Sequence, residues 1–198
     1  GAVTATSVSA TNNDISLIGG TTVALDTVTA GTGDVSITAS AGAITDISGA
    51  EGANVTGSAV TLSADGNIGV AGVGDIDTAA TALDVSVEDV AGNIVIEEAN
   101  DVELRALDTF NGDITVTLQS GDAEIGTIYA GTDTLGNVVL DVDQLPGQDV
   151  TDLDDNSAVT ADDLTISASG NIGTSELLAI NTTTGEYLSI DSITDGDI

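Results

Sequence analysis

The chain has 198 residues, with 33 acidic side chains, one arginine, and no lysine, histidine or cysteine. The resulting formal net charge of −32 repels nucleic acid and anionic lipid, so we expect neither as a partner. The absence of cysteine excludes disulfides, and the apolar runs are too short for insertion into a membrane.

Alternating apolar and polar residues predict short strands along the chain, whereas no segment keeps the 3.6-residue period of a helix. In chain order these strands are expected at 35–38, 83–88, 102–105, 114–118 and 139–143. Only two Tyr and one Phe are present, so the core is expected to consist of Val, Ile, Leu and Ala. Such a thin core suits a narrow solenoid better than a sandwich, in which large aromatic side chains usually fill the space between two sheets.

A short phrase, Gly followed by Asn or Asp and then Ile or Val, returns throughout the sequence. It occurs at 33–35, 66–68, 74–76, 92–94, 112–114, 136–138, 170–172 and 196–198. Most copies lie 18 to 26 residues apart, but the gaps of 33 and 34 residues after Asp34 and Asn137 indicate insertions or an extra half-coil. Gly, Asn and Asp tolerate the positive φ of a sharp bend, so the phrase is interpreted as the corner of a coil.

Segments 55–69 and 159–173 form the strongest internal repeat, with nine of fifteen aligned positions identical. A unit of this size must stack on its neighbours to bury its apolar face. We therefore predict an all-β fold, a right-handed parallel β-helix (β-solenoid) with about 18–26 residues per coil and two longer insertions. Residues 1–198 are expected to be one solenoid segment, an excerpt of a longer repetitive protein, with an acidic loop insertion at 144–163. An antiparallel sandwich is the alternative, although few hairpin turns are present.

The segments VTLSADGNIG (60–69) and LTISASGNIG (164–173) resemble the repeats of filamentous-haemagglutinin-like exoproteins and related giant bacterial surface adhesins. The resemblance implies a right-handed parallel β-helix that is exported to the cell surface and acts there as a stalk or fibre. It also implies an extracellular location and a distal region that binds a glycan or protein receptor.

Residues 152–163 follow the spacing of a calcium loop and resemble the loops of dockerin-type repeats. Oxygen ligands fall at loop positions 1, 3, 5 and 12, which are Asp152, Asp154, Asn156 and Asp163. Ser157 replaces the usual glycine at position 6. The alternative is an ordinary acidic corner, because Asp162 and Asp163 align with Ser58 and Ala59 in the earlier repeat.

Acidic pairs such as Asp75 with Asp77 and Asp141 with Asp143 each share one face of a strand and offer further cation sites. Carboxylates on neighbouring rungs, about 4.8 Å apart, repel each other by roughly 0.9 kcal/mol in water. This repulsion predicts that salt or bound Ca²⁺ stabilises the chain. The alternative is that the acidic surface serves solubility alone.

The chemical groups that the chain lacks limit the functions that it can have. Parallel β-helices also host polysaccharide-cleaving enzymes, but a chain without histidine or cysteine cannot build the usual nucleophilic triads. The single Arg105 is interpreted as an ion-pair partner of Glu103 or of a residue on an adjacent rung. We therefore predict a stiff, acidic, non-catalytic spacer in the stalk of a secreted adhesin, with flanking repeats of the same protein as its partners. The rival is a subunit that associates end to end into an extracellular filament or sheath, with Ca²⁺ as its cofactor, and a polysaccharide-active enzyme is the weak alternative.

Overall fold

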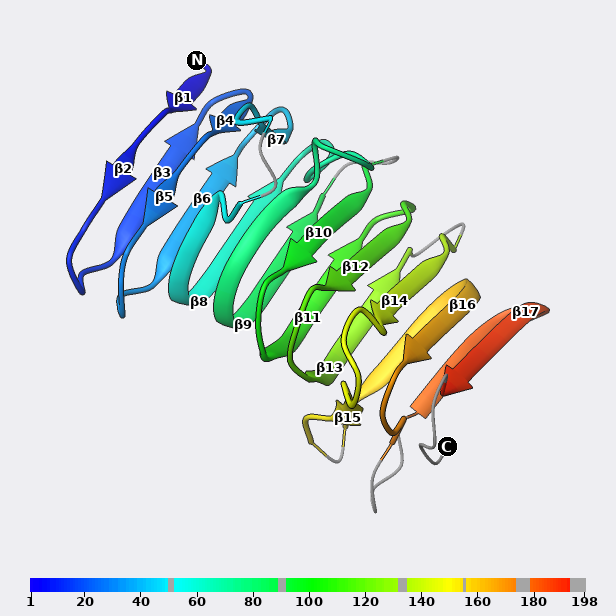
Figure 1. Ribbon diagram of the computed structural model, residues 1–198. Coiled ribbons are helices and arrows are strands. Elements are labelled where there is room, and N and C mark those ends of the chain that lie inside the picture. Colours follow the sequence, from blue (N-terminus) through cyan, green and yellow to red (C-terminus); the bar gives the residue numbers. More distant parts are fainter. Residues whose placement is uncertain (50–51, 89–91, 132–134, 155, 174–178, 193–198) are drawn as a thin grey trace.

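The computed structural model of the chain describes residues 1–49, 52–88, 92–131, 135–154, 156–173 and 179–192. In these ranges every regular element is a strand, and all strands pair in parallel, one coil upon the next (Figure 1). The predicted all-β parallel solenoid is confirmed. Across the same residues, no helix is present that is long and apolar enough to cross a membrane.

The strands lie in three stacks along the solenoid. The first stack contains β1 (Val3–Ala5), β4 (Val23–Leu25), β7 (Ile44–Asp46), β10 (Ile94–Glu98), β12 (Ile114–Leu118) and β14 (Val138–Val142). The second contains β2 (Val8–Ser9), β5 (Val28–Thr29) and β15 (Val150–Asp152), and the third contains β3 (Ile15–Gly19) and β6 (Val35–Ala39). Six longer strands bend around corners and belong to more than one stack. β9 (Ile76–Val87) belongs to all three stacks. The other five belong to two stacks each: β8 (Val55–Ala64), β11 (Val102–Thr109), β13 (Ala123–Ala130), β16 (Ala158–Ala168) and β17 (Ala179–Ser192). These bent strands join most of the stacks into one 14-stranded sheet.

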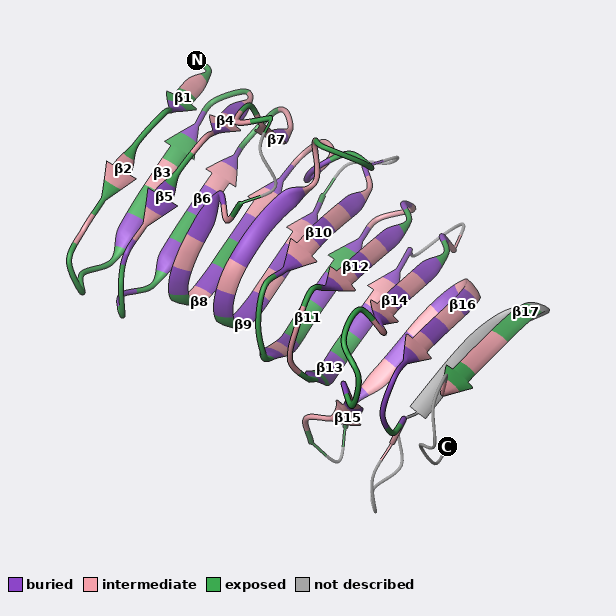
Figure 2. Cartoon of the chain, viewed as in Figure 1, coloured by how far each residue is buried: buried purple, intermediate pink, exposed green. Residues whose placement is uncertain are grey.

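Register agrees with the spacing predicted from the sequence. Neighbouring rungs of the first stack pair residues 20 to 26 apart, as for Val3 with Val23 and Ile68 with Ile94. All five predicted strands are present. Their ends differ by four residues or fewer, except that β9 begins at Ile76, seven residues before the predicted start at 83. Period-two alternation therefore located the strands, because each strand has one buried and one exposed face (Figure 2).

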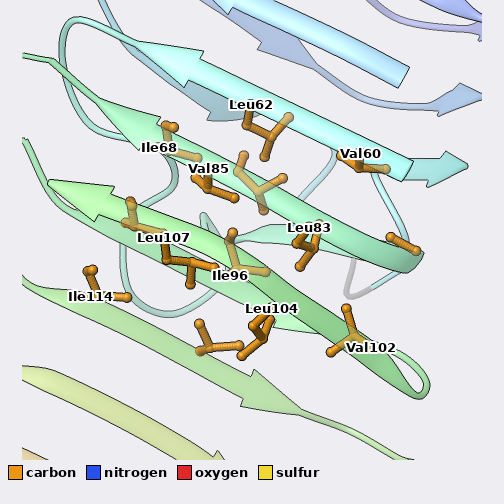
Figure 3. Close-up of a cluster of buried hydrophobic side chains, with 14 of the residues drawn as sticks. Val60, Leu62, Ile68, Leu83, Val85, Ile96, Val102, Leu104, Leu107 and Ile114 are labelled. Atoms are coloured by element: carbon orange, nitrogen blue, oxygen red, sulfur yellow. The ribbon is translucent and has the colours of Figure 1, made fainter. Parts of the chain in front are cut away.

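The core is a single column of aliphatic side chains that runs through the coils. Its buried hydrophobic members are all Val, Ile, Leu or Ala, as expected. Figure 3 shows how they stack: Leu62, Val85 and Leu107 occupy the same position on three successive rungs. Each side chain is thus covered by the coils before and after it, and no coil has a core of its own.

The glycine of the recurring phrase is required by close packing at the corners. A Cβ on Gly112 would collide with the carbonyl oxygen of Gly92, and a Cβ on Gly136 would collide with that of Gly112. None of these three glycines has a positive φ, and Asn12 is the sole non-glycine residue with positive φ among the described residues. The expectation of positive φ at these corners is therefore wrong. Stacked corners approach so closely that a Cβ does not fit.

The long gaps between copies of the phrase have a topological cause. Asp34 lies at the corner that precedes the third stack, and its side chain contacts Ala59 on the next rung. Asn67 lies at a different corner, the one that precedes the first stack. The gap between Asp34 and Asn67 was explained by an insertion or by an extra half-coil. The two copies lie at different corners, so the chain between them contains part of an extra coil, and the second explanation is correct.

The repeated segments 55–69 and 159–173 have the same local structure but lie on different faces. The N–H groups of Ser58 and Ala59 donate to Gly33 O and Asp34 Oδ1, at 2.9 and 3.0 Å. In the later copy, Asp162 and Asp163 donate in the same way to Gly136 O and Asn137 Oδ1, at 2.8 and 3.2 Å. However, β8 bends from the second stack into the third, whereas β16 bends from the third into the first. One bend motif therefore serves two corners of the coil.

The span 144–163, expected to be an acidic loop, is not a single loop. It contains β15 and the beginning of β16. Val150 on β15 pairs with Ala123 and forms a bridge to Ile172, so the chain rejoins the second stack within this span.

Candidate functional site

Acidic and amide side chains form ladders along two corners. At the corner before the first stack, the backbone N–H groups of Asn93, Asp113 and Asn137 donate to the side-chain Oδ1 of the corresponding residue one coil earlier, at 2.8–2.9 Å. At the corner before the second stack, Asp122 and Asp149 donate to Asp101 and Asp122, at 2.9 and 2.8 Å. Each Asx side chain therefore holds the register of the next coil.

The two ladders differ in charge, and this difference predicts opposite effects of exchanging Asp and Asn. Asp122 lies between Asp101 and Asp149, on rungs about 4.8 Å apart. Asp122→Asn keeps the acceptor oxygen and removes one charge, so we expect it to stabilise the fold by about 1 kcal/mol at low ionic strength. Asn93→Asp, in the ladder that contains Asp113, should destabilise it. The measurement is thermal unfolding of both variants at low salt and at about 1 M salt, where screening should remove the effects. Equal shifts for the two variants, or shifts unchanged by salt, would contradict charge repulsion as the cause.

Three carboxylates gather beside the first stack. Oxygens of Asp75, Asp77 and Glu97 lie within 4.8 Å of one another. Asp77 on β9 is the register partner of Glu97 on β10, and the side-chain amide of Gln119 on the next rung donates to Glu97 Oε1. Hard cations such as Ca²⁺ prefer several oxygen ligands of this kind. In the part of the chain described by the structure, these are the carboxylates that could hold a cation together.

A buried amide positions this carboxylate cluster. Asn54 is fully buried, and its Oδ1 accepts the backbone N–H of Asp77 at 3.0 Å. Its Nδ2 donates to Asp46 Oδ1 and Asp26 O, at 2.9 and 3.1 Å. Because an amide that is buried without partners costs free energy, this network fixes the start of β9 and with it the backbone of Asp77.

Glu98, next to Glu97 in the chain, points into the core. It occupies a column between Thr78 and Leu118 and has no exposed surface. Its carboxyl group accepts four hydrogen bonds: from Thr78 Oγ1 (2.7 Å) and from the backbone N–H groups of Ala80 (3.2 Å), Ala99 (2.9 Å) and Asn100 (3.2 Å). Burial nevertheless raises the pKa of Glu98, since withdrawal from water disfavours the charged form and outweighs these hydrogen bonds.

The predicted calcium loop is divided between two strands and a turn. Asp152 ends β15, and Asp163 lies within β16 at its bend. Between them, the side chain of Asp154 accepts the N–H of Asn156 at 2.8 Å, and the hydroxyl of Ser157 accepts the N–H of Asp154 at 3.0 Å. The structure thus shows a tight turn with internal hydrogen bonds. Calcium binding by Asp152, Asp154, Asn156 and Asp163 stays a prediction.

The second acidic pair named from the sequence is adjacent in space. Asp141 and Asp143 lie on β14 and just after it, and the side-chain amide of Gln144 donates to both, at 3.4 and 3.3 Å. A hydrogen bond to Asp141, together with partial burial and the nearby charges of Asp141 and Asp191, raises the pKa of Asp143. Like charges therefore contribute to this raised pKa, after the hydrogen bond and burial.

Arg105 pairs with Glu103, the first of the two alternatives that the sequence left open. Its Nη2 and Nε lie 2.8 and 2.9 Å from Glu103 Oε2. Both side chains are partly exposed, so the pair contributes about 0–1 kcal/mol. It lies beside an acidic hollow of about 240 Å³ that Asp101, Asp122 and Glu124 also line.

Two features escaped the sequence reasoning. Glu97 was not joined to Asp75 and Asp77, although the 20-residue spacing from Asp77 to Glu97 is the coil repeat. Glu98 was not recognised as buried, although alternation from Ile94 and Ile96 places it on the inward face of its strand. Register and period were therefore the signals that could have found both.

Comparison of the chain with protein-family models, with curated proteins and with solved structures gave no match.

Proposed function

We propose that this chain is a stiff, acidic spacer in the stalk of a secreted bacterial surface adhesin, without a catalytic role. The observation that supports this function most is the continuous core. One hydrophobic cluster extends from Ala5 to Ile172, so every coil is packed on its neighbours. Parallel stacking of this kind makes a rod whose stiffness comes from contacts between coils. The adhesin repeats that segments 60–69 and 164–173 resemble support the extracellular location.

The net charge supports the same role. A chain with 33 acidic residues and one Arg opposes lateral aggregation of neighbouring stalks through repulsion between like charges. Flanking repeats of the same protein would then be the main partners, because stacking strands can extend the rod at either end. A receptor-binding region would be carried at a distance from the cell.

Small-angle X-ray scattering with light scattering tests this proposal. A spacer should be monomeric and elongated over a wide range of protein concentration, with or without Ca²⁺. End-to-end assembly that depends on concentration or on Ca²⁺ would favour the filament subunit instead. Cleavage of a polysaccharide by the purified chain would contradict both structural functions.

A further inference from the structure

The segment that joins β8 to β9 is exposed at its tip (Figure 2), and large aliphatic side chains lie there. Val70 N donates to Gly74 O at 2.8 Å, and Asp75 N donates to Gly72 O at 3.1 Å, so the segment folds back on itself. Val70 and Val73 are 51% and 69% exposed. Large aliphatic side chains at the tip of a turn, on a chain with a charge of −32, are not explained by the packing of the solenoid.

Glycines define the shape of this turn. Gly69 and Gly72 have φ values of 71° and 82°, a conformation that favours glycine. A Cβ on Gly69 would also collide with the carbonyl oxygen of Val95. The base of the turn is therefore pressed against β10, and the turn holds a defined position on the first stack.

A hollow of about 270 Å³ lies beside the turn. Its lining includes Asn67, Val70, Ala71, Asn93, Val95 and Asp113. The volume is below the range of pockets that enclose drug-sized ligands, and it suits the insertion of one side chain. Apart from Asp113, these lining residues are apolar or carry an uncharged amide.

Carboxylates border the apolar centre on two sides. Asp113 lies at one edge of the hollow. Glu97 follows Val95 by two residues on the same face of β10, and Asp75 and Asp77 cluster with Glu97. An apolar centre with a charged rim is the usual anatomy of a protein interface. The negative charge of the rim decides which partner can bind, because complementary charge steers the encounter and like charge opposes it.

We propose that the turn 69–75 and the adjacent hollow, here called the Val73 patch, bind a cationic segment of another protein. The segment inserts an aliphatic side chain into the hollow beside Val70 and Val95, and covers Val73 at the exposed tip of the turn. It places Lys or Arg side chains against Asp113 and the cluster of Asp75, Asp77 and Glu97. A second copy of this chain is a poor occupant, since it would bring the same negative charge to the same rim.

Two probe peptides of equal charge test the proposal, acetylated and amidated (Lys-Val)4 and (Lys-Ser)4. With the full chain at about 0.15 M salt, fluorescence anisotropy should show (Lys-Val)4 binding about three- to tenfold more tightly, because the Val side chains can be buried at the patch. Val73→Ser should remove this difference and leave the affinity for (Lys-Ser)4 unchanged. Glu97→Gln should weaken both peptides.

Ile18→Ser is the matched control, because Ile18 is also 69% exposed but lies on β3, far along the chain from the patch. It should keep the preference for (Lys-Val)4. Equal affinity of the two peptides for the unmodified chain, or a preference that survives Val73→Ser, would overturn the proposal. Sedimentation velocity of the protein alone adds a further test: self-association that Val73→Ser abolishes would assign the patch to a second copy instead.

Discussion

Replacing Glu98 by glutamine should stabilise the protein at neutral pH, and the gain should shrink as the pH falls towards about 4. Burial raises the pKa of Glu98 above its ordinary value of 4.5, so the neutral acid is favoured in the folded state. A group with a raised folded-state pKa contributes most stability below its unfolded pKa and loses that contribution as the pH rises through the folded pKa. Glutamine resembles the neutral acid at every pH, so it avoids the cost of burying the charge.

The hydrogen bonds around Glu98 accommodate a neutral group. A glutamine oxygen can accept the N–H groups of Ala80, Ala99 and Asn100, as the carboxyl group does. Its amide N–H can donate to Thr78 Oγ1, while the Thr78 hydroxyl donates to the carbonyl oxygen of Glu97, which lies 3.3 Å away. All four partners of the carboxyl group then stay satisfied, and of the two new amide N–H groups one is paired with Thr78 Oγ1. Glu98→Ala removes the acceptor from three backbone N–H groups and leaves a cavity, and should cost about 3–5 kcal/mol.

Urea unfolding of the unmodified chain and of Glu98→Gln between about pH 4 and pH 8 measures the effect. Near pH 8 the free energy of unfolding of Glu98→Gln should exceed that of the unmodified chain by more than the roughly 0.5 kcal/mol typical of surface substitutions. Glu124→Gln is the control, because Glu124 is exposed on β13 and its replacement should leave the pH profile of the unmodified chain largely intact. A stability difference between Glu98→Gln and the unmodified chain that does not vary with pH would refute a raised pKa at Glu98.

Gly112→Ala should destabilise the fold strongly, although it adds only one methyl group. The added Cβ would meet the backbone carbonyl of Gly92, which cannot rotate away as a side chain can. Moving the two corners apart would also strain two hydrogen bonds. One is donated by Asp113 N to Asn93 Oδ1 (2.9 Å), and the other by Thr109 Oγ1 to Gly112 O (2.7 Å). We expect a loss of about 3 kcal/mol or more.

Gly52→Ala provides the comparison for Gly112→Ala. A Cβ on Gly52 would meet no atom within 4 Å, and Gly52 does not have a left-handed φ. Its replacement should therefore change stability by less than about 0.5 kcal/mol. The urea midpoints of Gly112→Ala and Gly52→Ala measure this difference in stability. If Gly112→Ala unfolds at the same urea concentration as the unmodified chain, the corners are not as tightly stacked as described, and the glycine has another purpose.

The sequence by itself determined the strands, the parallel solenoid and the composition of the core. These features depend on local alternation and on a repeat near 20 residues, both of which are visible in a linear string. The sequence also predicted the pair of Asp75 and Asp77, because two residues that alternate in a strand share one face. The sequence named Glu103 as one possible partner of Arg105, and the structure selected it over a residue on an adjacent rung.

Only the tertiary structure decided which corner each copy of the Gly-Asx phrase occupies, and why its glycine is needed. Coils of unequal length shift the phrase from one corner to another, so the repeats 55–69 and 159–173 lie on different faces despite nine identical positions of fifteen. Register pairs between coils join residues 20 to 31 positions apart. This register brings Glu97 to Asp77 and the carbonyl of Gly92 against Gly112. A period in the sequence gives the number of residues per coil only on average. The stacking of each coil on the next sets the actual register, and the candidate sites depend on that register.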